Sequence, residues 1–452
     1  MITVLKFGGT SVGSPEALTR VANIIVNGEG SKAVVVSAMS GITNFLESIV
    51  DDPNLKADDA LASFEKKHED VAKQLFDDKT LALFMAEFRE RINSFADLLN
   101  RPDARKDPYF KDAVVSQGER FSSLLLAHLL NKMGYKAVAL TSEMAGIVAV
   151  GKPQSGCADL LGTASGMTIN VKPLFDSGTV PVITGFYGIE KEGRPLTFGR
   201  GGSDYSAAIV ANALDADMLE IWTDVDGFMS ADPRIIPDAV KVDEMNFGEA
   251  AELAYFGAKV LHPRTIEPVR MKHIPLKVRN SFKPEEPGTL IHHLRKPRND
   301  LLRSVAVKTD LSIITVSSAE IAYRPAMVAR IIEKIAEINV IVYAISTSLS
   351  TIALLVHNLD VKQTLMKLNT LHAADIERID VKSNVALICA VGDNLLNKCG
   401  VSGDIFSVVK DAEANVEMIS EGASDVSLNF VVPMDRMMDV VRKLHDRYVG
   451  AA

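Results

Sequence analysis

Cysteine is scarce in this 452-residue sequence, which contains only Cys157, Cys389 and Cys399. An odd, small number of cysteines without C-x-x-C spacing does not suit a disulfide framework or a thiolate metal site, so we expect a reducing compartment. No apolar run reaches the roughly 18 residues of a membrane span, and no basic, signal-like region precedes the first apolar stretch. We therefore expect a cytoplasmic protein.

An excess of positive charge is also missing. The sequence has 49 basic and 58 acidic residues, which gives a net charge of -9. This balance argues against nucleic acid and against an anionic membrane surface as partners. The length of 452 residues exceeds that of one typical domain, so we expect two to four domains.

The stretch VLKFGGTSVG brings a lysine to a glycine turn near the N-terminus. The apolar residues before Lys6 predict a buried strand, and Gly8 and Gly9 follow it. Adjacent glycines let another group approach the backbone amides, and a helix expected over 14–26 would add its positive N-terminus, so the turn suits a phosphate. The string matches neither standard nucleotide fingerprint, and a plain tight turn with a solvated lysine is an equal alternative.

The remaining pattern predicts an α/β protein with a mainly parallel sheet between helices. Apolar runs such as AVVVSAM alternate with amphipathic stretches up to about residue 55, and residues from about 58 to 135 show helical spacing. VPVITGFYG and MLEIWTDVDG then predict buried strands that end in glycine turns, where open α/β sheets bind ligands. The segment from about 280 to 302 is rich in proline and charge and indicates a domain boundary.

The C-terminal part contains an internal repeat. Two units of about 65 residues each show the order strand, helix, strand, strand, helix, and the second begins near residue 384. This order predicts two ferredoxin-like α+β units. Such units carry no catalytic constellation, so we expect them to serve regulation or oligomerisation.

Polar residues cluster in several motifs of the first part. SQGERFS places Ser116 three residues before Glu119, which predicts a capping box, and on spacing alone this structural role is favoured. FGRGGSDYSA surrounds Arg200 with glycines ahead of Ser203 and Asp204. A helix cap explains the serine or the aspartate, but a guanidinium fork for a carboxylate on open backbone also explains the arginine and the glycines, so we favour a functional role.

Two later motifs are less specific. WTDVDGFMSADPR ends a strand with carboxylates that are usually plain turn formers. FGAKVLHPRT contains Lys259 and His262, and a single histidine before proline is more often structural than a ligand, so we assign His262 no role.

Taken together, the sequence resembles the aspartate kinase family of the amino-acid kinase fold, with tandem C-terminal ACT domains. The resemblance rests on KFGGTSVG, VSAMSGITN, SQGER, TGFYG, FGRGGSDYSA, WTDVDGFMSADPR and FGAKVLHPRT, in this order and followed by the two repeats. It implies transfer of the ATP γ-phosphoryl group to the β-carboxylate of L-aspartate, the first step of lysine, threonine and methionine biosynthesis, with ATP and Mg²⁺ as cofactors. The length leads us to expect no fused homoserine dehydrogenase.

The resemblance also implies a role for individual residues. Lys6 and Asp204 are the expected catalytic residues, and no protein metal site is assigned because Mg²⁺ would bridge the nucleotide phosphates. The expected nucleotide-binding residues are Lys6, Gly8, Gly9, Thr223, Asp224, Met229, Arg234 and Lys259, with Met229 where the family often has an aromatic residue. The expected aspartate-binding residues are Thr43, Glu119, Arg200 and Ser203.

The repeats imply control by an amino acid. ACT units of the family pair between subunits, which predicts a homodimer or a dimer of dimers. Ser346, Thr347 and Ser348 follow a predicted strand and are similar to a lysine-responsive pattern, so we expect lysine as the effector and threonine as the alternative. Hydroxyl residues at this place are also ordinary edge-strand and turn residues.

We expect a catalytic domain over 1–285, a linker over 286–302 and ACT units over 303–380 and 381–452. Two other functions remain open from the sequence. One is a catalytically silent amino-acid sensor, against which the presence of Lys6, Arg200 and Asp204 argues. The other is a different amino-acid kinase that acts on another carboxylate.

Overall fold

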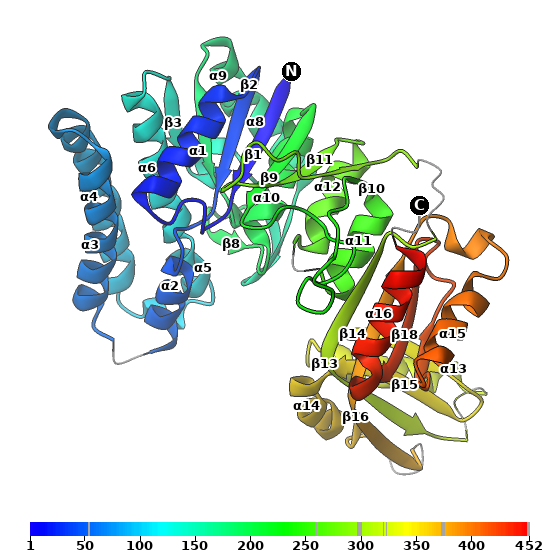
Figure 1. The fold of residues 1–452 in the computed structure, drawn as a ribbon. Coiled ribbons are helices and arrows are strands. Elements are labelled where there is room, and N and C mark those ends of the chain that lie inside the picture. The colour runs from blue at the N-terminus through cyan, green and yellow to red at the C-terminus, as the bar shows by residue number, and fades with distance from the viewer. Residues whose placement is uncertain are drawn as a thin grey trace. The chain divides into compact units, whose positions relative to one another are not determined.

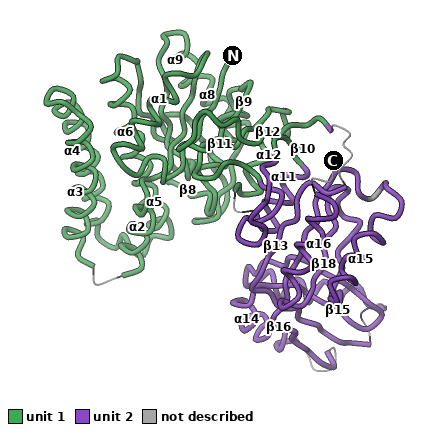
Figure 2. The backbone as a smooth tube through the Cα atoms, viewed as in Figure 1, with its two compact units in different colours: residues 1–228, 243–247, 259–294 green, residues 229–242, 248–258, 295–452 purple. Residues whose placement is uncertain are grey.

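The fold is described from a computed structural model of the chain, for residues 1–52, 55–258, 260–295, 301–319, 321, 323–371 and 376–449. The chain divides into two compact units (Figure 2). The first comprises residues 1–228, 243–247 and 259–294, and the second comprises 229–242, 248–258 and 295–452. Two segments from the middle of the chain therefore fold with its C-terminal part.

An eight-stranded sheet forms the centre of the first unit, in the order β10-β12-β11-β9-β1-β2-β6-β3 (Figure 1). Its strands are β1 (Ile2–Phe7), β2 (Ser31–Val36), β3 (Ala137–Leu140), β6 (Val180–Thr184), β9 (Met218–Thr223), β10 (Glu244–Asn246), β11 (Leu276–Asn280) and β12 (Thr289–His292). The pairs are parallel except for the antiparallel pair β11–β12. The predicted mainly parallel sheet is confirmed.

Helices cover both faces of this sheet. The helices of this part of the chain are α1 (Pro15–Asn27), α2 (Ile42–Asp51), α3 (Ala57–Leu75), α4 (Asp78–Asn100), α5 (Phe110–Val115), α6 (Gln117–Lys132), α7 (Ser142–Ala145), α8 (Leu160–Asn170), α9 (Lys172–Asp176), α10 (Gly202–Leu214) and α12 (Ile266–Met271). Two short hairpins, β4 (Ala149–Lys152) with β5 (Ser155–Ala158) and β7 (Tyr187–Ile189) with β8 (Pro195–Thr197), lie outside the main sheet. Short 3₁₀ helices in the two units are η1 (Ala104–Lys106), η2 (Pro263–Thr265), η3 (Asn358–Asp360), η4 (Leu395–Asn397) and η5 (Met434–Arg436).

Strand periodicity determines which residues of β1 enter the core. Leu5 and Phe7 pack with α1 and α6 in one apolar cluster. Successive side chains of a strand point to opposite faces, so Lys6 lies on the other face. Helix α10 contacts β1, β2 and β9 there. The same alternation that buries two apolar residues thus turns Lys6 toward α10.

The helical stretch expected from about 58 to 135 is confirmed as α3, α4 and α6 with shorter helices between them. A cluster of aromatic rings joins these helices, with Phe64 and Phe121 in edge-to-face contact at 4.9 Å between ring centroids. His68 lies inside this cluster and is fully buried. Its Nδ1 is 2.8 Å from the Phe64 carbonyl oxygen, and its Nε2 has no hydrogen-bond partner among the described residues.

The second unit is built on a six-stranded antiparallel sheet in the order β14-β15-β13-β16-β18-β17. Its strands are β13 (Ser304–Ser317), β14 (Val342–Thr347), β15 (Thr351–His357), β16 (Arg378–Val391), β17 (Met418–Ser420) and β18 (Ser427–Pro433). Its helices are α11 (Phe247–Phe256), α13 (Pro325–Ala336), α14 (Val361–Leu368), α15 (Val401–Asp411) and α16 (Met437–Tyr448). The predicted repeat of strand, helix, strand, strand, helix is confirmed.

The two repeats share their central strands. The last half of β13 contributes Ile314 and Val316 to a core with α13 and α14. Its first half pairs with the end of β16 and contributes Val305 to a core with α15 and α16. Strand β12 lies inside the stretch 286–302 that was expected to be a linker. The domain boundaries stay predictions.

Among the described residues, no helix combines the length and the apolarity that crossing a bilayer requires.

The buried histidine leads to a prediction about stability. Burial lowers the pKa of His68 from its ordinary value of 6.5 to about 4, so the folded chain holds a neutral ring. The unfolded chain binds a proton near pH 6.5, and folding stability is therefore lost as the pH falls from about 6.5 toward 4, by up to about 3 kcal/mol. Urea unfolding followed by the fluorescence of Trp222, the single tryptophan, measures this loss.

The His68→Leu variant should lose less stability than the natural chain over the same pH range. His293→Gln, at an exposed histidine, is the control and should keep the natural dependence. Parallel curves for the natural chain and His68→Leu would contradict the assignment.

Candidate active site

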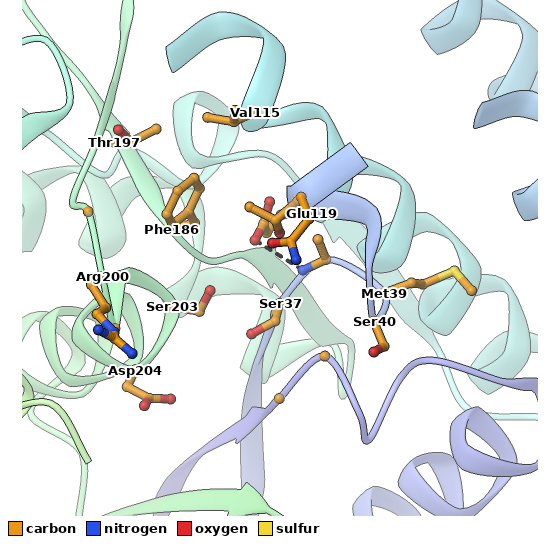
Figure 3. Close-up of a pocket in the computed structure, with 18 of the residues that line it drawn as sticks. Ser37, Met39, Ser40, Val115, Glu119, Phe186, Thr197, Arg200, Ser203 and Asp204 are labelled. Carbon is orange, nitrogen blue, oxygen red and sulfur yellow. Dashed lines mark hydrogen bonds between the residues drawn. The ribbon is translucent and has the colours of Figure 1, made fainter. Parts of the chain in front are cut away.

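A cavity of about 860 Å³ opens in the first unit beside the segments that follow β1, β2 and β9 (Figure 3). Gly8 and Gly9 follow β1, Ser37 follows β2, and Asp224 follows β9, and all four line the cavity. Open α/β sheets bind ligands at the carboxyl ends of their strands. The cavity is therefore at the place where this fold accommodates a ligand.

The cavity brings together most of the residues that the sequence indicated. Its lining includes Lys6, Gly8, Gly9, Thr43, Glu119, Arg200, Ser203, Asp204, Thr223 and Asp224. Met229 and Arg234 belong to the second compact unit. Lys259 lies outside the described residues.

An ion pair joins the strand that carries Lys6 to the helix on its face. Lys6 Nζ lies 2.5 Å from Asp204 Oδ1, and Lys6 is only 7% exposed. Asp204 belongs to the first turn of α10, where the helix dipole favours a negative charge. The pair holds a cation at the cavity wall in a fixed position.

The glycine turn after β1 is confined by the segment after β2. The amide of Gly8 donates to the Trp222 carbonyl at 3.1 Å. A Cβ on Gly9 would lie 2.8 Å from the Ala38 carbonyl oxygen, closer than real Cβ atoms approach. Close packing thus requires a glycine at position 9. This requirement suits a plain tight turn, and it is also compatible with a turn whose amides bind a phosphate.

The segment that carries Arg200 depends on glycine for its backbone. Gly199 and Gly201 have φ angles of 73° and 71°, in the left-handed region. A Cβ on Gly201 would lie 2.3 Å from the Cβ of His262. The cap of α10 is Gly201, which excludes the alternative in which Ser203 or Asp204 caps this helix. Both residues lie inside the first turn and face the cavity instead.

The predicted capping box at the start of α6 is also wrong. Ser116 has helical dihedral angles, and its hydroxyl donates to the Ala113 carbonyl at 3.1 Å. Glu119 Oε1 instead accepts from the amide of Ala38 at 3.0 Å. The spacing of Ser116 and Glu119 is that of a capping box. However, α5 continues almost directly into α6, so the Ser116 side chain makes no capping hydrogen bond.

Glu119 is the most unusual carboxyl group of the cavity. It is 2% exposed, and its Oε2 has no hydrogen-bond partner among the described residues. Burial raises its pKa to about 8. A buried acceptor at a cavity wall suits a ligand that brings a positive charge or a donor.

Several lining residues had no role predicted from the sequence, including Ser37, Ser40, Asn44, Lys111, Gln154 and Thr197. VSAMSGITN supplied a signal for the first three, because its polar residues follow a buried strand. Gln154 and Thr197 come from the two hairpins and had no distinguishing pattern.

The fold and the site define a class of protein. Residues 1–280 match the amino acid kinase family, and residues 388–448 match the ACT domain. Among curated proteins, lysine-sensitive aspartokinase 3 of Escherichia coli is 32% identical, with 98% of each chain covered. Aspartokinase 1, chloroplastic, of Arabidopsis thaliana is 31% identical over 98% of this chain and 80% of its own length.

Solved structures agree with these relatives. E. coli aspartokinase III in complex with aspartate and ADP has a TM-score of 0.83, with 32% identity and 99% of each chain covered. The chain belongs to the aspartokinases, a group of amino acid kinases with ACT domains. It spans about half the length of its bifunctional aspartokinase/homoserine dehydrogenase relatives, such as 51% of one from Arabidopsis thaliana. The predicted family, fold and enzyme class are confirmed.

Proposed function

We propose that the chain transfers the γ-phosphoryl group of ATP to the β-carboxylate of L-aspartate and releases ADP and 4-phospho-L-aspartate. The observation that carries this proposal is the cavity that combines the Lys6–Asp204 ion pair with Arg200 and Glu119. The complex of E. coli aspartokinase III with aspartate and ADP supports the choice of substrates.

One set of groups in the cavity suits aspartate. The planar guanidinium of Arg200 can bind the α-carboxylate with two parallel hydrogen bonds. Glu119 offers its unpartnered Oε2 to the ammonium group. The hydroxyls of Thr43 and Ser203 line the same cavity and can donate to the remaining carboxylate oxygens. This arrangement provides a hydrogen-bonding partner for each of the three charged groups of the substrate.

A second set suits the phosphates. Lys6 would bind the transferring phosphoryl group, with the amide of Gly9 beside it, while Asp204 fixes its ammonium group through the ion pair. The amide of Gly8 already donates to the Trp222 carbonyl, so Gly8 would contribute through its lack of a side chain. The positive N-terminus of α10 lies next to this pair. The β-carboxylate is already ionised at neutral pH, so an oxygen of it can attack the γ-phosphorus without a general base. The protein then contributes position and charge, as phosphoryl transfer requires.

Mg²⁺ fits this site as a companion of the nucleotide. The described residues contain no group of three or more His, Cys, Asp or Glu side chains that could enclose a metal. Mg²⁺ is commonly bound by one or two carboxylates together with substrate phosphates, and Asp204 and Asp224 both line the cavity. The ion would neutralise charge on the phosphates.

We assign the nucleotide to Thr223 and Asp224, with Met229, Arg234 and Lys259 as further candidates. Thr223 and Asp224 line the cavity. Arg234 forms an ion pair with Asp232 at 2.5 Å, and its side chain is 79% exposed. A phosphate could approach the exposed guanidinium but would share it with the carboxylate of Asp232.

We also propose lysine as an inhibitor that binds the first ACT unit. E. coli aspartokinase III has been solved with lysine and aspartate. Ser346 and Thr347 are exposed at the end of the edge strand β14. Ser348 lies in the turn after it, where its hydroxyl is 2.6 Å from that of Thr351. Ser346 and Thr347 are therefore the better effector candidates. Pairing of ACT units into a homodimer or a dimer of dimers remains part of this proposal.

Contacts within the second unit suggest a route by which effector binding to the ACT repeats changes the position of a proposed nucleotide-binding residue. Ser304 Oγ donates to the Met229 carbonyl at 2.8 Å, and the amide of Val305 donates to the Ser230 carbonyl at 2.8 Å. Ser230 Oγ also lies 2.8 Å from His445 Nε2 on α16. A rearrangement of β13 or α16 would displace the segment that contains Met229.

Lys6→Ala should reduce kcat at least about 100-fold, because the substitution removes a charge directed at the transferring phosphoryl group, worth roughly 3 kcal/mol or more. Steady-state kinetics with ADP detection measures the effect. Lys73→Ala, at a lysine on α3 that pairs with Glu69 on the surface, is the control. A folded Lys6→Ala variant with a kcat within tenfold of the natural value would exclude this role.

The raised pKa of Glu119 predicts a pH dependence of aspartate binding. Below about pH 8 the free enzyme holds a neutral Glu119 carboxyl, whereas the ammonium group of aspartate favours the carboxylate. The aspartate KM should therefore fall as the pH rises from about 6 to 8, by up to roughly tenfold per pH unit. Glu119→Gln should flatten this dependence, and Glu47→Gln, at a less buried carboxyl of the same cavity, should retain it. An unchanged slope in Glu119→Gln would assign the titration to another group.

Lysine at millimolar concentration should inhibit the full chain, while threonine and methionine are tested separately and in combination. Ser346→Ala and Thr347→Ala should raise the lysine concentration for half-inhibition several-fold without changing activity in its absence. Ser407→Ala, on α15 of the second repeat, should leave the inhibition unchanged. Initial rates that do not respond to lysine would exclude lysine as the effector and leave the kinase reaction unaffected.

A further inference from the structure

The segment between β8 and α10, which carries Arg200, is tied to a buried carboxylate. Thr197 is the last residue of β8, and both its amide and its hydroxyl donate to Asp112 Oδ1 at 2.6 Å. Asp112 belongs to α5 and is fully buried. Figure 3 shows Thr197 and Arg200 on the same side of the cavity, opposite Ser37 and Ser40.

The same carboxylate holds a second part of the cavity wall. The amide of Gln154, in the turn between β4 and β5, donates to Asp112 Oδ1 at 3.0 Å and to Oδ2 at 3.1 Å. Gln154 has a φ angle of 62°, which residues other than glycine adopt rarely. A Cβ on Gly199 would have the Gln154 carbonyl oxygen as its nearest neighbour, at 3.7 Å. Asp112 thus fixes both backbone segments that meet next to Arg200.

A cation holds the segment from another direction. Arg264 Nη1 donates to the Phe198 carbonyl at 2.9 Å, and its Nη2 donates to the Gly156 carbonyl at 2.8 Å. The guanidinium stacks over the ring of Tyr205, 4.7 Å from its centroid. Its fork therefore joins the residue two positions before Arg200 to strand β5.

These two charged residues compensate for the freedom of the glycines. Gly199 and Gly201 flank Arg200, and a backbone with glycine on both sides has many accessible conformations. A bidentate contact to a carboxylate requires the guanidinium to be placed to within a fraction of an ångström. Asp112 fixes the position of Thr197, and Arg264 fixes that of Phe198. The backbone that leads into Gly199 therefore has one defined position and direction.

We propose that Asp112 and Arg264 are positioning residues that direct Arg200 at the α-carboxylate of aspartate. Neither would touch the substrate. The inference rests on the proposed role of Arg200 and adds to it the two residues through which the fold sets the affinity for aspartate. Arg264 belongs to the motif FGAKVLHPRT, whose last part had no assigned role.

Asp112→Asn and Arg264→Lys test this inference in the full-length enzyme. Asparagine replaces one acceptor oxygen by a donor group, and lysine keeps the charge but loses the fork. Each variant should raise the aspartate KM at least about tenfold, while the ATP KM changes less than about twofold. Asn212→Ala removes a buried hydrogen bond to the Pro268 carbonyl at the far end of α10 and is the matched control, for which we expect both KM values to stay unchanged.

Arg200→Lys, measured in parallel, separates two kinds of failure. A selective rise in the aspartate KM for Arg200→Lys, without one for Asp112→Asn and Arg264→Lys, overturns the positioning role and leaves the proposed function standing. No selective rise for Arg200→Lys itself overturns the assignment of Arg200. Should Asp112→Asn not fold, Arg264→Lys decides alone, and an equal rise in both of its KM values overturns the inference.

Discussion

The ion pair between the buried Lys6 and the largely buried Asp204 is the constraint on which the site depends. Burial of two charges costs several kcal/mol for each ion unless they are paired with good geometry, so the strand and the helix that carry them cannot shift independently. The parallel pairing of β1 with β2 and β9 fixes the position of Lys6 along the sheet. The first turn of α10 supplies Asp204, together with the positive end of the helix dipole. A cation and a helix N-terminus therefore face the same cavity.

Close packing around Ala38 links this pair to the side of the cavity that we propose for aspartate. The amide of Ala38 donates to Glu119, its carbonyl oxygen excludes a side chain at Gly9, and its Cβ excludes one at Gly118. The segments after β1, after β2 and at the start of α6 meet at one small residue. A side chain at Gly9 or Gly118 would push these segments apart, so the glycines of KFGGTSVG and SQGER are required for packing, whatever they contribute to binding.

The second unit uses chain segments that lie within the part matched to the amino acid kinase family. Ala231 and Ile236 pack in one core with α15 and α16, and Glu249 forms a buried ion pair with Arg303 at 3.0 Å. The segment that contains Met229 and Arg234 therefore shares its stability with the ACT repeats. Met229 and Arg234, two of the proposed nucleotide residues, thus belong to the same unit as the ACT repeats, which offers a direct route for the proposed regulation of nucleotide binding.

The sequence alone indicated the mainly parallel sheet with its helices, the two C-terminal repeats and ten of the residues that line the cavity. Hydrophobic periodicity and glycine turns are local properties, and Lys6, Arg200 and Asp204 stand in motifs with unusual local composition. Strand β12 was not predicted, because it has only four residues and the proline-rich, charged sequence around it is typical of a linker.

Only the tertiary structure decided which partners these residues take. Ser116 and Glu119 have the spacing of a capping box, yet Glu119 bonds Ala38, which is 81 residues away, and Asp112 bonds Thr197, which is 85 residues away. The division of β13 between two cores is likewise invisible in its own residues. Such contacts depend on how whole elements pack, since burial and close approach are set by neighbours from distant parts of the chain and not by local spacing.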